Sequence, residues 1–177
     1  PKLRLVSYAP LASEVQMLAL GALRLGNAKM KQIAVIAHLF YPNIWPEINK
    51  AIDNFIAVCG HNEVDVFVTY PEGLPELGKL VPPYAKAMPC ENRGYDVGPF
   101  FKVLSEIDLD DYKYIAKLHT KRDTDPIWFM FCKYPGGSSH RRTLLSICDT
   151  IKHTQRTLYA LEHDKSIGMI AARNLID

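Results

Sequence analysis

The feature that most constrains the fold is a series of short apolar runs that are rich in β-branched residues. IAVIAHLF (33–40) and VDVFVTY (64–70) have almost no polar side chains in their interior. Strands of this kind are typical of a parallel sheet, because helices cover both of its faces and leave no polar side. AKAMPC (85–90), YKYIAKLH (112–119) and SIGMIAA (166–172) are predicted as further strands of the same sheet.

The segments between these runs are predicted as helices. In residues 41–60 the apolar side chains recur every three or four positions, with Asn43 as the expected N-cap and Gly60 as the expected stop. Further helices are predicted over residues 97–107 and 141–164. Because strands and helices alternate, we predict an α/β fold of three layers, in which a mostly parallel sheet is flanked by helices.

The length of 177 residues fits one globular domain with a sizeable core. Residues 11–25 have a helix-like composition, so we predict an N-terminal helical segment over residues 1–31, a linker or remnant, and the main domain over residues 32–177. Since the chain begins at Pro1 and stops just after an apolar run, we expect a piece of a longer protein, with the main domain truncated at its C-terminus.

Composition argues against several classes of function. A net charge of +2 is far from the strongly basic balance of nucleic-acid-binding proteins, so no nucleic acid is expected as a partner. No apolar run reaches the roughly 18 residues of a membrane span, and the first residues lack the apolar core of a signal peptide. The four cysteines are widely spaced without a CxxC pair, which favours free thiols in a reducing cytoplasm over a metal site.

Polar residues follow three of the predicted strands, at the carboxyl ends where open α/β sheets bind their ligands. They make up the candidate site: His38, Tyr41, Asn92, Arg93, Gly94, Asp96, Gly98, His119, Thr120, Lys121 and Arg122. A structural role is the alternative for each stretch: a buried core histidine after the first strand, a turn with a helix cap after the third, and a solvated basic loop after the fourth.

In the stretch after the third predicted strand, Gly94 suits a positive φ in a tight turn, and Asp96 is the expected cap of a helix that begins near Val97. A helix N-terminus attracts anions, but a carboxylate that caps its amides would repel a phosphate. We therefore expect Asp96 against a sugar hydroxyl, a base edge or a reacting proton.

In the stretch after the fourth predicted strand, alternation places Lys117, His119 and Lys121 on one side of the extended chain. Lys121 and Arg122 emerge at the strand end, where a cation would neutralise charge that develops on a diphosphate leaving group. Many nucleotide-sugar enzymes fill this role with a metal held by carboxylates. The residues here are His-Thr-Lys, so we predict that no metal is bound and that Lys121 takes its place.

The chain resembles the rhamnan synthesis protein F family over about residues 32–172, on five stretches in order: IAVIAHLFYPNIW, VDVFVTYP, ENRGYDVGPF, YIAKLHTKR and SIGMIAA. The resemblance implies a bacterial protein of rhamnose-polysaccharide and lipopolysaccharide synthesis, with a Rossmann-like, GT-A-like core that binds a nucleotide sugar. It implies transfer of L-rhamnose from dTDP-rhamnose to a lipid-linked glycan. An inverting transfer needs a general base, for which Asp96 is the first candidate and His119 the second.

The same resemblance implies a place in the cytoplasm, at the inner face of the cytoplasmic membrane through peripheral association, and other polysaccharide-assembly enzymes or domains as partners. An alternative function of a different class stays open. The chain would then be a non-catalytic module that binds a glycan or nucleotide within an assembly complex. The two alternatives differ in whether the NRGYD and HTK stretches face one cleft within reach of a diphosphate.

Overall fold

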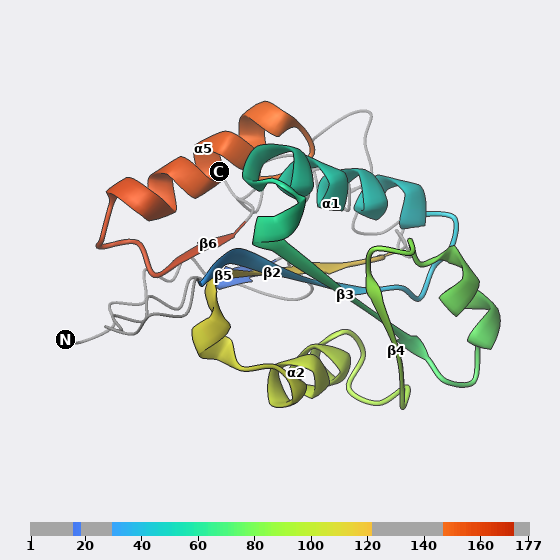
Figure 1. The fold of residues 1–177 in the computed structure, drawn as a ribbon. Coiled ribbons are helices and arrows are strands. Elements are labelled where there is room, and N and C mark those ends of the chain that lie inside the picture. The colour runs from blue at the N-terminus through green and yellow to red at the C-terminus, as the bar shows by residue number, and fades with distance from the viewer. Residues whose placement is uncertain (1–15, 19–29, 122–146, 172–177) are drawn as a thin grey trace, which may run out of the picture.

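The computed structural model describes residues 16–18, 30–121 and 147–171. Its elements are β1 (Gln16–Leu18), β2 (Lys31–His38), α1 (Trp45–Cys59), η1 (His61–Glu63), β3 (Val64–Pro71), η2 (Pro75–Leu80), β4 (Lys86–Cys90), α2 (Val97–Glu106), η3 (Leu109–Asp111), β5 (Tyr112–His119), α5 (Ile151–His163) and β6 (Met169–Ala171). Figure 1 shows three layers, with α1 and α5 over one face of a sheet and α2 over the other.

The strands form one sheet in the order β4-β3-β2-β5-β1-β6. The four strands from β4 to β5 are mutually parallel, whereas β1 runs antiparallel to both β5 and β6. The predicted three-layer, Rossmann-like α/β fold with a mostly parallel sheet is therefore confirmed. All four parallel strands end at the same edge of the sheet, which is the edge where such folds bind ligands.

The hydrophobic core lies on both faces of the sheet. On β2, Val35 and Ala37 pack into the cluster under α1 and α5, while Ala34 and Ile36 pack into the cluster over α2. Side chains alternate between the faces of a strand, so a strand covered on both sides needs apolar residues at every position. This is why the sequence of β2 has no polar face in its interior.

The N-terminal segment differs from its prediction at the residues that can be described. Residues 16–18 form strand β1, not part of a helix, while residues 1–15 and 19–29 lie outside the described residues. β1 fills the space between β5 and β6, where Met17 is the register partner of both Ala116 and Ile170. Pairing on two sides satisfies the backbone groups of β1, and this outweighs the local helix propensity of the segment.

Two helix starts also differ from the prediction. The N-cap of α1 is Ile44, because the Ile44 amide donates to the Tyr41 carbonyl in a turn that precedes the helix, and Asn43 lies before the cap. α5 begins at Ile151 behind Thr150, whose hydroxyl accepts from the His153 amide at 3.1 Å. Residues 147–150 are non-helical, and residues 141–146 lie outside the described residues. At α5 the hydroxyl cap of Thr150 thus sets a later start than the apolar spacing predicted.

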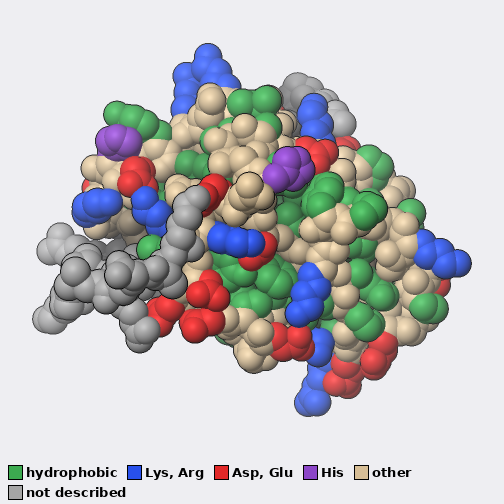
Figure 2. Space-filling view, viewed as in Figure 1, with side chains coloured by type: hydrophobic (Ala, Val, Ile, Leu, Met, Phe, Trp, Pro, Cys, Tyr) green, Lys and Arg blue, Asp and Glu red, His purple; other side chains and the backbone are tan. Residues whose placement is uncertain are grey.

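The surface carries mixed charge. Figure 2 shows lysine and arginine side chains interspersed with acidic ones over the face in view, in keeping with the net charge of +2. Within the described ranges, no helix combines the length and apolar character needed to cross a membrane. Cys59, Cys90 and Cys148 are free thiols, as predicted, and Cys132 lies outside the described residues.

Candidate functional site

The carboxyl ends of three neighbouring strands place polar side chains in one row on the α2 face of the sheet. His38 on β2 is the register partner of Thr69 on β3 and of His119 on β5. Lys117 lies two residues before His119 and therefore on the same face. All four side chains are buried. A buried polar row at this edge is unlike the rest of these strands, whose interior positions are mainly apolar.

Asp96 joins this row from the turn that precedes α2. It occupies the N-cap position of α2, as predicted, but its carboxylate makes no cap hydrogen bond. Instead the carboxylate accepts a hydrogen bond from the Lys117 ammonium, and its Oδ2 lies 3.7 Å from His119 Nδ1. The prediction that the Asp96 side chain caps the helix amides is therefore wrong, and so is the argument that this cap would repel a phosphate.

The physical reason lies in the turn itself. The amides of Val97 and Gly98 both donate to the carbonyl of Gly94 at 3.1 Å, so the backbone already satisfies the first amides of α2. A desolvated ammonium is also a stronger partner for a carboxylate than a backbone amide. Asp96 consequently turns towards the strands.

The charge state of Asp96 follows from its neighbours. Burial raises the pKa of the Asp96 carboxyl. The charge of His119, together with the hydrogen bond and the charge of Lys117, lowers this pKa by more than burial raises it, so the pKa lies below its usual value. Asp96 is therefore ionised at neutral pH. An ionised carboxylate of low pKa is a good hydrogen-bond acceptor but a weak proton acceptor.

His38 is held in the neutral form. Burial lowers the pKa of His38 to about 4, with Asp96 acting in the opposite direction and Lys117 in the same direction. Its Nδ1 lies 2.9 Å from Thr69 Oγ1, and that hydroxyl donates to the Ala37 carbonyl at 3.2 Å. Since the hydroxyl proton points to Ala37, the ring has its proton on Nδ1 and its lone pair on Nε2. His38 therefore has the contacts of a buried, hydrogen-bonded core histidine, which was the alternative predicted for it.

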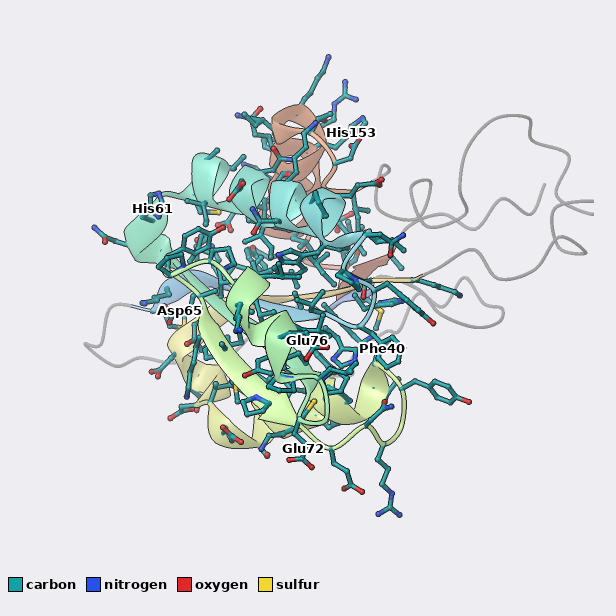
Figure 3. The ribbon with its side chains drawn as sticks, turned by 90° about the vertical axis from the view of Figure 1, so that its right-hand side faces the viewer. Phe40, His61, Asp65, Glu72, Glu76 and His153 are labelled. Atoms are coloured by element: carbon teal, nitrogen blue, oxygen red, sulfur yellow. The ribbon has the colours of Figure 1, made fainter. Side chains whose placement is uncertain are left out.

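Thr120 connects the ends of β2 and β5. Its hydroxyl accepts from the amides of Phe40 and Tyr41 at 2.8 and 2.9 Å, and its own amide donates to the His38 carbonyl at 2.9 Å. Figure 3 shows Phe40 between the two helix layers, on the side of the molecule that faces the viewer. These bonds bring Tyr41 and the start of the HTK stretch together, although 79 residues separate Tyr41 from Thr120.

Two residues of the turn over residues 91–96 have a positive φ, the predicted Gly94 and, unpredicted, Tyr95. Gly94 has a φ of 76°, and Tyr95 follows with a φ of 55° while its side chain is 88% exposed. A Cβ at Gly98 would lie 2.1 Å from the Arg93 carbonyl oxygen, so only glycine permits this close approach of the turn to the first turn of α2.

Most of the predicted site residues thus lie at one edge of the sheet. Asp96 and His119 are in direct proximity, His38 is in the same row, and Thr120 holds Tyr41. Of the remaining predicted residues, Asn92 and Arg93 have exposed side chains on the turn, and Gly94 and Gly98 shape it. Lys121 is half-buried after Thr120, and Arg122 lies outside the described residues. Their roles towards a ligand stay predictions.

Sequence reasoning missed Lys117 as a site residue, although it placed Lys117 on the same side as His119. The signal was present: a lysine stands among Ile115, Ala116 and Leu118 in a buried strand. A buried ammonium needs a partner, and the acidic residue of the neighbouring NRGYD stretch supplies it.

The described residues contain no group of three or more histidine, cysteine, aspartate or glutamate side chains that could hold a metal ion. The ionic groups at this edge include an ion pair, with Lys117 as the cation next to Asp96. Such an arrangement offers a hydrogen-bond acceptor and two imidazole rings at the ligand-binding edge.

In a comparison with known families, the family model described as rhamnan synthesis protein F matches residues 11–175. The matched range includes every residue that the structure describes, strand β1 among them. No curated protein and no solved structure gives a significant match to the chain.

Proposed function

The chain belongs to the rhamnan synthesis protein F family, and from this membership we propose that it is a glycosyltransferase, or the donor-binding domain of one, in rhamnan synthesis. The proposed reaction transfers L-rhamnose from dTDP-rhamnose to a growing cell-surface polysaccharide on a lipid-linked acceptor. The observation that carries the proposal is the cluster of the half-buried Asp96 with the buried Lys117 and His119 at the carboxyl edge of a parallel sheet. This is the edge at which α/β folds bind nucleotides and sugars.

In the proposed transfer, the acceptor hydroxyl oxygen forms a bond to the anomeric carbon of the donor. The bond from that carbon to the diphosphate oxygen breaks, and dTDP leaves with the electron pair. The hydroxyl proton passes to a general base. Such a base must have a lone pair available at neutral pH and must contact the acceptor.

The geometry supports His119 as this base and Asp96 as its partner, which reverses the order predicted from sequence. Asp96 is paired with Lys117, and its low pKa makes it a weak proton acceptor. His119 Nδ1 lies 3.7 Å from the Asp96 carboxylate, and a carboxylate at this distance stabilises the imidazolium that forms when His119 takes the proton.

We assign the leaving diphosphate to Lys121, with Arg122 beside it in sequence, and propose that no metal is required. Lys121 follows Thr120, which is hydrogen-bonded to His38 at the end of β2 and to Phe40 and Tyr41 in the loop after it, so Lys121 begins at a rigid point of the strand edge. A preorganised cation there would stabilise the charge that develops on the diphosphate. The turn over residues 92–98, Tyr41 and His38 would contact the rest of the donor.

We further propose that the protein works in the bacterial cytoplasm at the inner face of the membrane, where the lipid-linked acceptor and other assembly enzymes would be its partners. A glycan carrier in the membrane and a soluble nucleotide sugar must meet at one enzyme, and peripheral association would allow this.

The experiment is a thermal-shift measurement of the chain with dTDP-rhamnose, dTDP and UDP, each with and without EDTA. At about 100-fold excess over Kd a ligand adds roughly 2.7 kcal/mol, so dTDP-rhamnose and dTDP should raise Tm by roughly 5–10 °C for a chain of this size. EDTA should leave this shift unchanged. Lys121→Ala should weaken dTDP binding by about 10-fold, because a hydrogen bond between charged groups is lost.

Lys152→Ala is the matched control, since Lys152 is exposed on α5, which covers the opposite face of the sheet. Equal dTDP affinity in Lys121→Ala and Lys152→Ala would remove Lys121 from the site. A folded chain that no nucleotide stabilises would contradict the donor site altogether. Binding of dTDP-rhamnose without turnover by the full-length protein would instead support the non-catalytic module.

A further inference from the structure

We propose that Lys117 is the positioning residue of the candidate site: its ammonium turns the Asp96 carboxylate away from the amides of α2 and towards the ends of β2 and β5, where the carboxylate accepts a hydrogen bond from a sugar hydroxyl of the ligand. That the ligand is a nucleotide sugar rests on the proposed function. The positioning itself rests only on contacts within the chain.

The first argument is the burial of Lys117. Its side chain is 8% exposed, it lies inside β5, and its Nζ is 5.9 Å from the centre of the Phe100 ring. A charged ammonium in such surroundings loses its hydration, and a buried ion pair seldom adds stability over apolar side chains of the same volume. An apolar residue would match Ile115 on the same face of the strand. Stability alone therefore does not account for a lysine here.

The second argument is the orientation of Asp96. At an N-cap an aspartate commonly accepts from the second or third amide of its helix. Here the Gly94 carbonyl takes the amides of Val97 and Gly98, and the Asp96 carboxylate makes no cap bond. The ammonium of Lys117 on β5 supplies the hydrogen bond that fixes the carboxylate over the strand ends. The side chain of Asp96 is 19% exposed, so the carboxylate is held in place but not sealed from a ligand.

The third argument is the set of charges around Asp96. The groups that face it are Lys117 and His119 on β5 and His38 on β2. Burial raises the pKa of Asp96, while His119 and Lys117 together lower it, with a net decrease. Without the ammonium, burial would be opposed only by His119 and a backbone hydrogen bond, so the pKa of the Asp96 carboxyl would be higher, and the carboxylate would lose the hydrogen bond that holds it over the strand ends.

The experiment measures the titration of the Asp96 carboxyl carbon by NMR in the full chain, with Asp96→Asn used to assign the signal. In the unchanged protein the pKa of Asp96 should lie below its ordinary value of 3.8. Lys117→Met should raise it by about one unit or more, because one close opposite charge is lost. Lys117→Arg keeps the charge and should restore the low pKa. A residue that only fills space would not change this titration.

The ligand readout compares affinities for dTDP-rhamnose and for dTDP, which lacks the sugar. Asp96→Asn and Lys117→Met should each weaken dTDP-rhamnose by about 10-fold and leave dTDP within about threefold, as expected for one hydrogen bond to a charged acceptor. The double variant should be no weaker than either single variant, since both remove the same contact.

An Asp96 pKa at or above 3.8 in the unchanged protein would overturn the inference even if Lys117→Met failed to fold. An unchanged Asp96 titration in Lys117→Met would also overturn it. Equal losses of dTDP and dTDP-rhamnose affinity would overturn the assignment of Asp96 to the sugar. If the unchanged protein bound neither nucleotide, the proposed function and the sugar contact would fall, while the Asp96 titration would still decide whether Lys117 positions Asp96.

Discussion

His38 lies at the end of β2, in a row with Thr69 and His119, and its surroundings decide its charge. Burial lowers the pKa of His38 to about 4, while the hydrogen bond between Nδ1 and Thr69 Oγ1 fixes the ring in one orientation. The residue is therefore neutral over the whole physiological range. It can accept a hydrogen bond at Nε2 but contributes no charge to the site at neutral pH.

The low pKa of His38 predicts a loss of stability at moderately acidic pH. The unfolded chain takes up a proton at His38 below its usual pKa of 6.5, whereas the folded chain does so only near pH 4. The free energy of unfolding therefore falls between pH 6.5 and pH 4, by about 3 kcal/mol for this group. His38→Asn keeps a donor for Thr69 and removes the titration, so urea denaturation at pH 7 and pH 5 should show a smaller difference in this variant.

His61→Asn is the control, because His61 is exposed in η1. It should keep the pH dependence of the unchanged chain. The lowered pKa of Asp96 gives stability that is fully present above its ordinary value of 3.8 and is lost below it, so it does not change the free energy of unfolding between pH 7 and pH 5. If His38→Asn and the unchanged chain lost stability equally over this range, the low pKa of His38 would be contradicted.

The start of α2 depends on a close approach between the helix and its own turn. The Arg93 carbonyl points at the first turn of α2, and Gly94 adopts a positive φ so that its carbonyl can accept the Val97 and Gly98 amides. This backbone cap releases the Asp96 side chain for the strands. The turn and the helix thus act as one unit that carries Asp96 to the sheet edge.

Gly98→Ala tests this unit. The added Cβ would lie 2.1 Å from the Arg93 carbonyl oxygen, so the turn must shift, at a cost of about 1–3 kcal/mol in the free energy of unfolding. Thermal denaturation measures the loss. Gly73→Ala is the matched control, because a Cβ added at Gly73 would have no neighbouring atom within 4 Å and the φ of Gly73 is not positive. A Gly98→Ala variant as stable as Gly73→Ala would show that the turn is looser than the structure describes.

In the molecule as a whole, β1 brings residues 16–18 into the sheet. It is the antiparallel strand between β5 and β6, so it pairs on both sides, and the family match also includes these residues. Without it, β5 would present an unpaired edge next to the candidate site. Unpaired edges invite pairing with other chains.

A shortened chain of residues 30–177 tests this role. It loses the backbone hydrogen bonds of β1 on both sides, at about 1 kcal/mol for each bond, so the free energy of unfolding should fall by roughly 2–4 kcal/mol. Size-exclusion chromatography should also show more association than for the full chain. Equal stability and equal elution of the two chains would contradict the role of β1 and would favour the predicted separate N-terminal segment.

Local sequence determined much of the fold. The apolar runs predicted β2 to β5 within two residues, and the helical spacing predicted α1, α2 and α5, although the predicted start of α5 came too early. Gly94 predicted its own positive φ, and the polar residues after the strands predicted where the candidate site would lie. These features depend on residues a few positions apart, through φ preferences and the alternation of buried faces.

Only the tertiary structure decided the features that depend on distant partners. The three residues of β1 are a strand because β5 and β6 flank them, and the Asp96 carboxylate leaves its own helix because Lys117 lies on another element 21 residues later. The order of strands, β4-β3-β2-β5-β1-β6, is likewise set by packing. The physical reason is common to all three: a backbone group or a charge bonds to whichever partner the fold brings within reach, and sequence spacing does not encode that distance.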